Sequence, residues 1–161
     1  MTARRTLVAG IGNVFLGDDG FGVEVVRRLA ERPRRADVHV VDFGIRGLDL
    51  AWALAEHDRA ILVDAAPRGA PPGTLYVIEP DLAAIAAAAE RTVEAHGVVP
   101  ERALAMAAAL GGRLRFARIV GCEPGVLPEG DDVIVALSAP VAAAVDAAVA
   151  LVEELIEASD A

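Results

Sequence analysis

Short runs of apolar residues alternate along this chain with segments in which apolar residues recur at helical spacing. Five of the runs have the length and aliphatic content of buried strands. The predicted strands are Thr6–Ile11, Asp37–Phe43, Arg59–Ala65, Thr74–Ile78 and Arg115–Gly121. Turn-forming residues close several of them, beginning with the Gly10-Ile-Gly12 sequence after the first run.

The segments between these strands carry helix signals. Phe21, Val25 and Leu29 share one face of the first helix, Asp18-Asp19 occupy its N-cap position, and Pro33 stops it. Ser138 is expected to cap the last helix, whose apolar positions repeat at helical spacing up to Leu155. The predicted helices are Gly20–Glu31, Gly47–His57, Leu82–Glu90, Pro100 to Gly111-Gly112, and the long C-terminal segment after Ser138.

Strands that alternate with helices predict an α/β fold. We expect a three-layer sandwich, in which helices cover both faces of a mostly parallel five-stranded sheet. The 161 residues are enough for one sizeable core, and no internal repeat or linker interrupts them. The sequence therefore predicts a single domain over residues 1–161.

Composition and charge narrow the class of protein. The net charge is -9 at pH 7, so a nucleic-acid backbone or an anionic membrane surface would repel the chain. Cys122 is the only cysteine, which excludes internal disulfides and cysteine-rich zinc sites and fits a reducing compartment. Signal-peptide and membrane-span patterns are missing from the sequence. We expect a soluble cytoplasmic protein that binds neither nucleic acid nor membrane.

Acidic residues follow three of the predicted strands, where open α/β sheets bind their ligands. They are Asp18-Asp19 after the first strand, Asp42 at the end of the second and Asp64 at the end of the third. Asp64 is the most informative, because a buried strand would favour another aliphatic residue there. A purely structural role, accepting hydrogen bonds from a neighbouring loop, is the alternative for each acid taken alone.

A dinucleotide-binding site is a competing hypothesis, because Gly10-Ile-Gly12 lies between a strand and a helix. The third glycine of that motif would fall at position 15, which is Phe15. Two carboxylates at the start of the helix would also repel a pyrophosphate. The pattern thus argues against a dinucleotide-binding site at this edge of the sheet.

His96 lies in a glycine-containing loop with no apolar periodicity to explain it, whereas His39 and His57 have ordinary structural positions. Together with carboxylates from other loops, His96 would form an oxygen and nitrogen ligand set suited to zinc or nickel. A solvent-exposed loop histidine is the alternative. The sequence offers no serine nucleophile elbow, and Cys122 is expected to be a buried small hydrophobe.

At this point the motifs resemble a known family, the NiFe hydrogenase maturation endopeptidases. The resemblance begins with Val8-Ala-Gly-Ile-Gly-Asn13 and Leu16-Gly-Asp-Asp-Gly-Phe-Gly22, which are its most specific part. It continues in order through nearly the whole chain. The later matching segments are Asp42-Phe-Gly-Ile-Arg-Gly-Leu48, Leu62-Val-Asp64, Pro72-Gly73-Thr74, the His96 loop and Leu137-Ser-Ala-Pro-Val141.

The resemblance implies a protease that removes a short C-terminal extension from the hydrogenase large-subunit precursor after nickel insertion. It implies a metal site formed by Asp19, Asp64 and His96, with nickel brought by the substrate and zinc or cadmium as substitutes in the isolated protein. The chain departs from the family at Asp42-Phe43-Gly44-Ile45-Arg46-Gly47, where Ile45 replaces the usual threonine. This departure is expected to mark a different partner hydrogenase.

Two mechanisms remain open for such an enzyme. The metal would polarise the scissile carbonyl or activate water, or an aspartate would act as general base, with Asp42 as a candidate. A non-catalytic nickel checkpoint or chaperone protein and a nucleotide-binding domain are the alternative functions. The turn-rich loop Pro67–Gly73 follows Asp64 directly, and we expect it to border the site, with Arg68 contributing to precursor binding.

Overall fold

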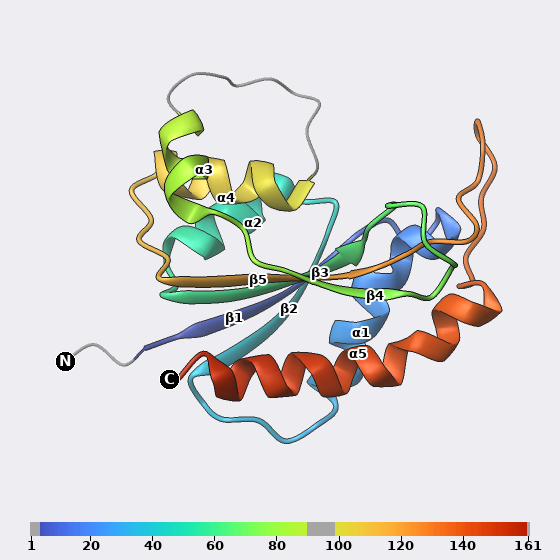
Figure 1. The fold of residues 1–161 in the computed structure, drawn as a ribbon, viewed down its shortest axis with the longest axis horizontal. Helices are drawn as coiled ribbons and strands as arrows, with labels where there is room; N and C mark the ends of the chain where they lie inside the picture. Colours follow the sequence, from blue (N-terminus) through green and yellow to red (C-terminus); the bar gives the residue numbers. More distant parts are fainter. Residues whose placement is uncertain (1–3, 90–98, 161) are drawn as a thin grey trace.

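A five-stranded sheet forms the centre of the molecule (Figure 1), whose computed structural model describes residues 4–89 and 99–160. Four strands run parallel, and only the edge strand β4 pairs antiparallel, with β5. The expected mostly parallel sheet is confirmed. In the spatial order β2-β1-β3-β5-β4, the strands are β1 (Thr6–Ile11), β2 (Val38–Gly44), β3 (Arg59–Ala65), β4 (Leu75–Ile78) and β5 (Phe116–Cys122).

Helices cover both faces of the sheet (Figure 1). On one face lie α1 (Phe21–Ala30) and α5 (Ala139–Ala158), and on the other lie α2 (Gly47–Ala55), α3 (Leu82–Ala89) and α4 (Val99–Ala109). Two cores result, one on each face, and the central strands β1 and β3 are buried nearly throughout because both of their faces are covered. Nothing among the described helices has the length and apolarity to cross a bilayer.

The apolar periodicity located the buried faces of α1 and α5 correctly. Phe21, Val25 and Leu29 of α1 are buried, and so are Val141 and Val145 of α5. These buried residues of α1 and α5 form one core together with the residues on the same face of β1 and β3. Most element boundaries lie within one or two residues of the prediction, which is the usual variation at the ends of helices.

The capping predictions need two corrections. Asp18 and Asp19 belong to a short 3-10 turn, Gly17–Gly20, and α1 begins at Phe21 with Gly20 as its N-cap and no side-chain capping bond. Ser138 is the N-cap of α5, but its hydroxyl donates to Asp18 and its oxygen accepts no capping bond from the helix. Both corrections have one cause. The Asp18 carboxylate accepts hydrogen bonds from distant segments, so it does not cap α1, and one of its donors is the Ser138 hydroxyl.

The sequence predicts that the fourth helix begins at Pro100, whereas Val99 is already the first residue of α4. Pro100 then lies in the first turn of the helix, where its missing N–H costs no hydrogen bond. His96 lies outside the described residues.

Candidate active site

Asp19 and Asp64 meet at the carboxyl edge of the sheet. Asp64 is the last but one residue of β3, is only 8% exposed, and accepts a 2.8 Å hydrogen bond from the Ala65 N–H at Oδ1. Asp19 lies on the 3-10 turn after β1, and its Oδ2 accepts a 2.8 Å hydrogen bond from the Asn13 N–H. The sequence placed both acids at strand ends, and parallel pairing of β1 with β3 brings those ends together.

The electrostatics of Asp64 are unusual. Burial is the main cause that raises its pKa to about 8, and the charges of Asp19 and Glu101 raise it further, against the lowering effect of the Ala65 N–H. Asp64 therefore carries a proton at neutral pH in the isolated protein. A carboxyl group with a pKa near neutrality is suited to proton transfer.

Glycines make the close approach of these segments possible. Gly12 has a φ of +137°, and a Cβ there would lie 1.9 Å from the Asp19 carbonyl oxygen. A Cβ at Gly22 would lie 2.0 Å from the Val63 carbonyl oxygen. Gly12, which suggested a phosphate-binding loop, and Gly22 therefore allow the Asp19 turn and α1 to pack tightly against β1 and β3.

Asp18 is a structural anchor that the sequence reasoning did not distinguish from its neighbour. It is fully buried and accepts four hydrogen bonds of 2.7 Å, from the N–H groups of Gly125, Val126 and Ser138 and from the Ser138 hydroxyl. Burial alone would raise the pKa of Asp18, but these bonds lower it below its ordinary value. The ionised carboxylate thus ties the segments before α5 to the turn that carries Asp19.

Asp42 lies apart from this pair. It is exposed on edge strand β2, and β1 separates β2 from β3. Gly10 is the register partner of both Asp42 and Val63, so two strand spacings, about 10 Å, separate the backbones of β2 and β3 at this level. Asp42 flanks the Asp19–Asp64 pair, and its carbonyl oxygen accepts a 2.7 Å bond from Arg46.

Glu101 is an acid of this region that the sequence reasoning missed. It lies in the first turn of α4, and its charge contributes to the raised pKa of Asp64. Its Oε2 atom is buried and has no hydrogen-bond partner among the described residues. An acidic residue directly after Pro100, at the start of a helix, was the available signal, but such residues are common in first turns for helix-dipole reasons alone.

The described residues do not form a complete metal site. Within residues 4–89 and 99–160, no group of three or more His, Cys, Asp and Glu side chains is close enough to hold an ion. Asp19 and Asp64 supply oxygen donors of the kind that divalent ions accept. A third donor would have to come from the remainder of the chain or from a bound partner.

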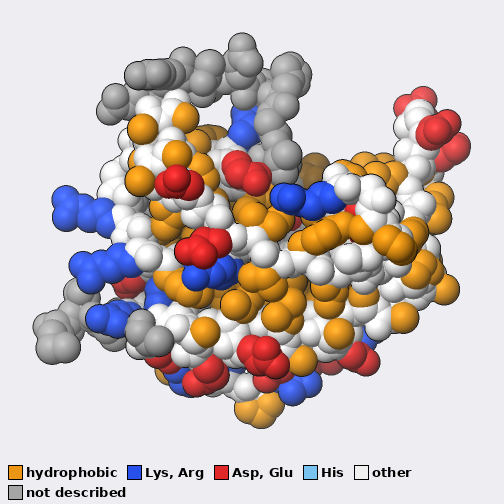
Figure 2. Space-filling model, viewed as in Figure 1, with side chains coloured by type: hydrophobic (Ala, Val, Ile, Leu, Met, Phe, Trp, Pro, Cys, Tyr) orange, Lys and Arg blue, Asp and Glu red, His pale blue; other side chains and the backbone are white. Residues whose placement is uncertain are grey.

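Apolar side chains are exposed around the same edge of the sheet. Phe15 follows β1, Ile45 follows β2, and Leu48 and Trp52 lie one turn apart on α2, all of them more than half exposed. The segment between β5 and α5 exposes four more, Val126, Leu127, Val133 and Val135. Figure 2 shows this segment projecting from the body, with acidic side chains at its tip. Exposed apolar residues around a site are typical of a surface that binds another protein.

Comparison with known proteins identifies relatives of the whole fold. The chain matches the family model of hydrogenase maturation proteases over residues 23–155, a range that begins just after Asp19. It is 34% identical over 148 residues to the hydrogenase expression/formation protein HupD of Rhizobium leguminosarum bv. viciae, covering 91% of this chain and 71% of HupD. It is 35% identical to HoxM of Azotobacter vinelandii, covering 80% of this chain and 62% of HoxM, so the match spans less than two thirds of that relative's length.

Two solved structures have the same fold. The hydrogenase 2 maturation peptidase from Thaumarchaeota archaeon SCGC_AB-539-E09 superposes with a TM-score of 0.74 at 33% identity, covering 96% of this chain and 99% of the other. The hydrogenase maturating endopeptidase HybD from E. coli gives a TM-score of 0.77 at 26% identity, covering 96% and 93% of the two chains. The similarity therefore extends over the whole sheet and both helical layers.

Proposed function

Because the chain belongs to the hydrogenase maturation protease family, we propose that it is the endopeptidase that removes the C-terminal extension of a NiFe hydrogenase large-subunit precursor. The observation that carries this proposal beyond family membership is the pair formed by the buried Asp64 and the half-buried Asp19 at the carboxyl edge of the sheet. Exposed apolar residues around that pair support a protein substrate rather than a small one.

Nickel enters this proposal as part of the substrate. Asp19, Asp64 and His96 would engage a nickel ion already held by the precursor and so bring the scissile bond to the site. Asp64 holds a proton below about pH 8, and a cation that binds there must displace it. Free metal is therefore expected to bind weakly at neutral pH, and a preassembled nickel centre would supply the missing ligands.

The hydrolysis itself needs a water molecule and a proton acceptor. The water oxygen attacks the scissile carbonyl carbon while one proton of the water moves to a carboxylate, and a proton passes to the leaving nitrogen as the C–N bond breaks. Asp64 is suited to donate the proton to the nitrogen, because it is protonated at neutral pH, and the adjoining Asp19 is better placed than Asp42 to accept the proton of the water. Polarisation of the carbonyl by the nickel is the alternative way to lower the barrier.

The test is cleavage of a purified precursor in its nickel-loaded and nickel-free forms. The protein is incubated with each form, and the loss of mass at the precursor C-terminus is measured. We expect cleavage only of the nickel-loaded form. Binding without any loss of mass would replace the protease proposal with a non-catalytic checkpoint role, and equal cleavage of both forms would remove nickel as the recognition signal.

Variants then test the residues. Asp64→Asn and His96→Ala should each abolish cleavage while the protein stays folded. Asp146→Asn is the matched control, because Asp146 is an exposed carboxylate on α5 whose partner is Arg28. Processing at the wild-type rate by Asp64→Asn would exclude Asp64 from both metal recognition and proton transfer.

A further inference from the structure

Glu123, directly after β5, is a buried carboxylate that holds a surface loop. It is 4% exposed and accepts hydrogen bonds from the Arg68 N–H at 2.8 and 3.1 Å, the Ala70 N–H at 2.9 Å and the Tyr76 hydroxyl at 2.9 Å. Burial alone would raise the pKa of Glu123, but these donors lower it. A buried charge is tolerated only with such full pairing, so the loop has a fixed conformation.

The loop held in this way is residues 67–73, between β3 and β4. Its last residue, Gly73, also donates to the Glu123 carbonyl oxygen at 2.9 Å, and the Glu123 N–H donates to Thr74 at 2.8 Å. The next residues of the same segment, Gly125 and Val126, donate to Asp18. One short stretch of chain therefore fixes the loop and the Asp19 turn relative to each other.

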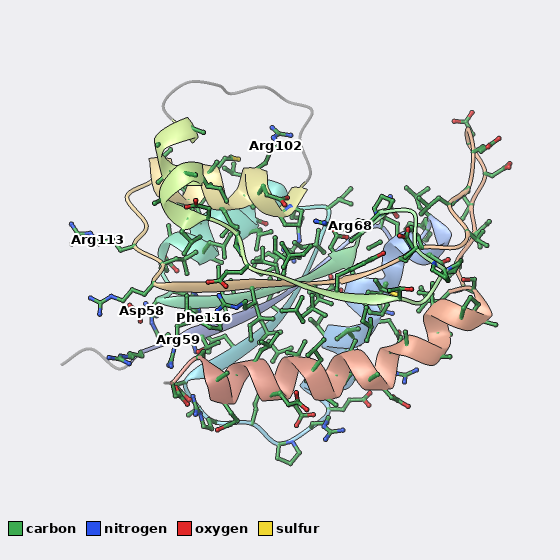
Figure 3. All side chains as sticks on the ribbon, in the orientation of Figure 1. Asp58, Arg59, Arg68, Arg102, Arg113 and Phe116 are labelled. Carbon is green, nitrogen blue, oxygen red and sulfur yellow. The ribbon has the colours of Figure 1, made fainter. Side chains whose placement is uncertain are left out.

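This loop presents the side chain of Arg68. Arg68 is exposed, its guanidinium lies 5.7 Å from the Tyr76 ring centroid, and no carboxylate of the described residues lies within 4.0 Å of it in an ion pair. Figure 3 shows the side chain extending from the loop toward the beginning of α4. Glu101 and the acidic centre occupy that end of the sheet. Arg68 is thus a preoriented cation at the border of an acidic site.

We propose that Arg68 binds a carboxylate of the precursor segment that carries the scissile bond, an inference that rests on the proposed protease function. The charges of Asp19 and Glu101 repel a substrate carboxylate from the centre, whereas the planar guanidinium offers it paired N–H donors. Substrate bound in this way has its anionic group at the loop and its peptide bond at the aspartate pair. The carboxylate is either the C-terminal group of the precursor or an acidic side chain of its extension.

The experiment measures initial rates of cleavage against the concentration of nickel-loaded precursor. Arg68→Gln should raise KM by about 10- to 100-fold, the value of a charge-assisted hydrogen bond, with kcat nearly unchanged. Arg68→Lys should lose less, because it keeps the charge without the paired donors. Arg113→Gln is the control, since Figure 3 shows this exposed arginine at the far end of the molecule. Thermal unfolding should be the same for all of these variants.

Precursor variants identify which carboxylate is bound. In one set the acidic residues of the extension are changed singly to amides, and in the other the extension is lengthened to displace its C-terminal carboxylate. The bound group is the one whose change raises KM for the wild-type protein and has no further effect with Arg68→Gln. If no substrate change behaves in this way, the proposal is wrong.

The outcomes separate this inference from the proposed function. A wild-type protein that leaves the precursor intact contradicts the protease function itself. A wild-type protein that cleaves, together with an unchanged KM for Arg68→Gln, contradicts only the role of Arg68. A fall in kcat at constant KM would also overturn it, because the guanidinium would then act on the reacting atoms rather than on a distant carboxylate.

Discussion

Replacing Asp64 with asparagine should stabilise the protein while abolishing its activity. The folded-state pKa of about 8 exceeds the ordinary aspartate value of 3.8 by about four pH units. At 1.36 kcal/mol per pKa unit, ionising Asp64 in the folded protein lowers the free energy of unfolding of the wild type by at most about 6 kcal/mol. The sign follows from the proton count: the unfolded chain releases the Asp64 proton near pH 4, whereas the folded protein retains it until about pH 8.

The stability that Asp64 contributes is therefore fully present below about pH 4, and it declines as the pH rises until it is lost above about pH 8. Asp64→Asn cannot ionise, so its free energy of unfolding should exceed that of the wild type by an amount that grows with pH. The slope should approach about 1.4 kcal/mol per pH unit between pH 5 and 7 and should level off above pH 8.

The assay is denaturant unfolding of both proteins from pH 4 to pH 9, with cleavage measured in parallel. Each kcal/mol corresponds to about 2–4 °C in the melting temperature for a chain of this length, so thermal melts resolve the difference easily. Asp146→Asn is again the control, because it removes an exposed carboxylate outside the Asp19–Asp64 pair. A constant difference between Asp64→Asn and wild type would refute the reasoning, because it would mean that Asp64 is ionised in the folded protein at neutral pH.

Three further predictions concern residues around the site and at the opposite edge. Asp18→Ala should cost about 3–5 kcal/mol in denaturant unfolding, because it leaves buried N–H donors unpaired, and hydrogen exchange should show faster opening of the segment between β5 and α5. Gly22→Ala should cost more than Gly47→Ala, by at least about 2 kcal/mol, since a Cβ at position 22 meets backbone at 2.0 Å and one at position 47 meets nothing within 4 Å. His57 is buried, which is the main reason that its pKa is lowered, so wild-type stability should fall as the pH drops below about 6.5 and His57→Gln should reduce that fall in an acid titration of unfolding.

The order of the elements and the buried faces of α1 and α5 followed from the sequence alone. Apolar runs and helical periodicity are local properties of the chain, and burial on both faces makes the central strands nearly continuous in apolar residues. Asp64 stood out for the same reason, because a carboxylate at the end of a buried strand is a local exception to that pattern. The sequence motifs also gave the correct family.

The tertiary structure decided what each acid does. Asp18 and Asp19 are adjacent and chemically identical, yet Asp18 is buried among four donors from distant segments and Asp19 lies beside Asp64. The roles of Glu101 and Glu123 were equally hidden, because the groups that they contact are far away in sequence. Local patterns determine where strands and helices form, whereas the environment of a charge depends on which segments the fold brings together, and that depends on long-range packing.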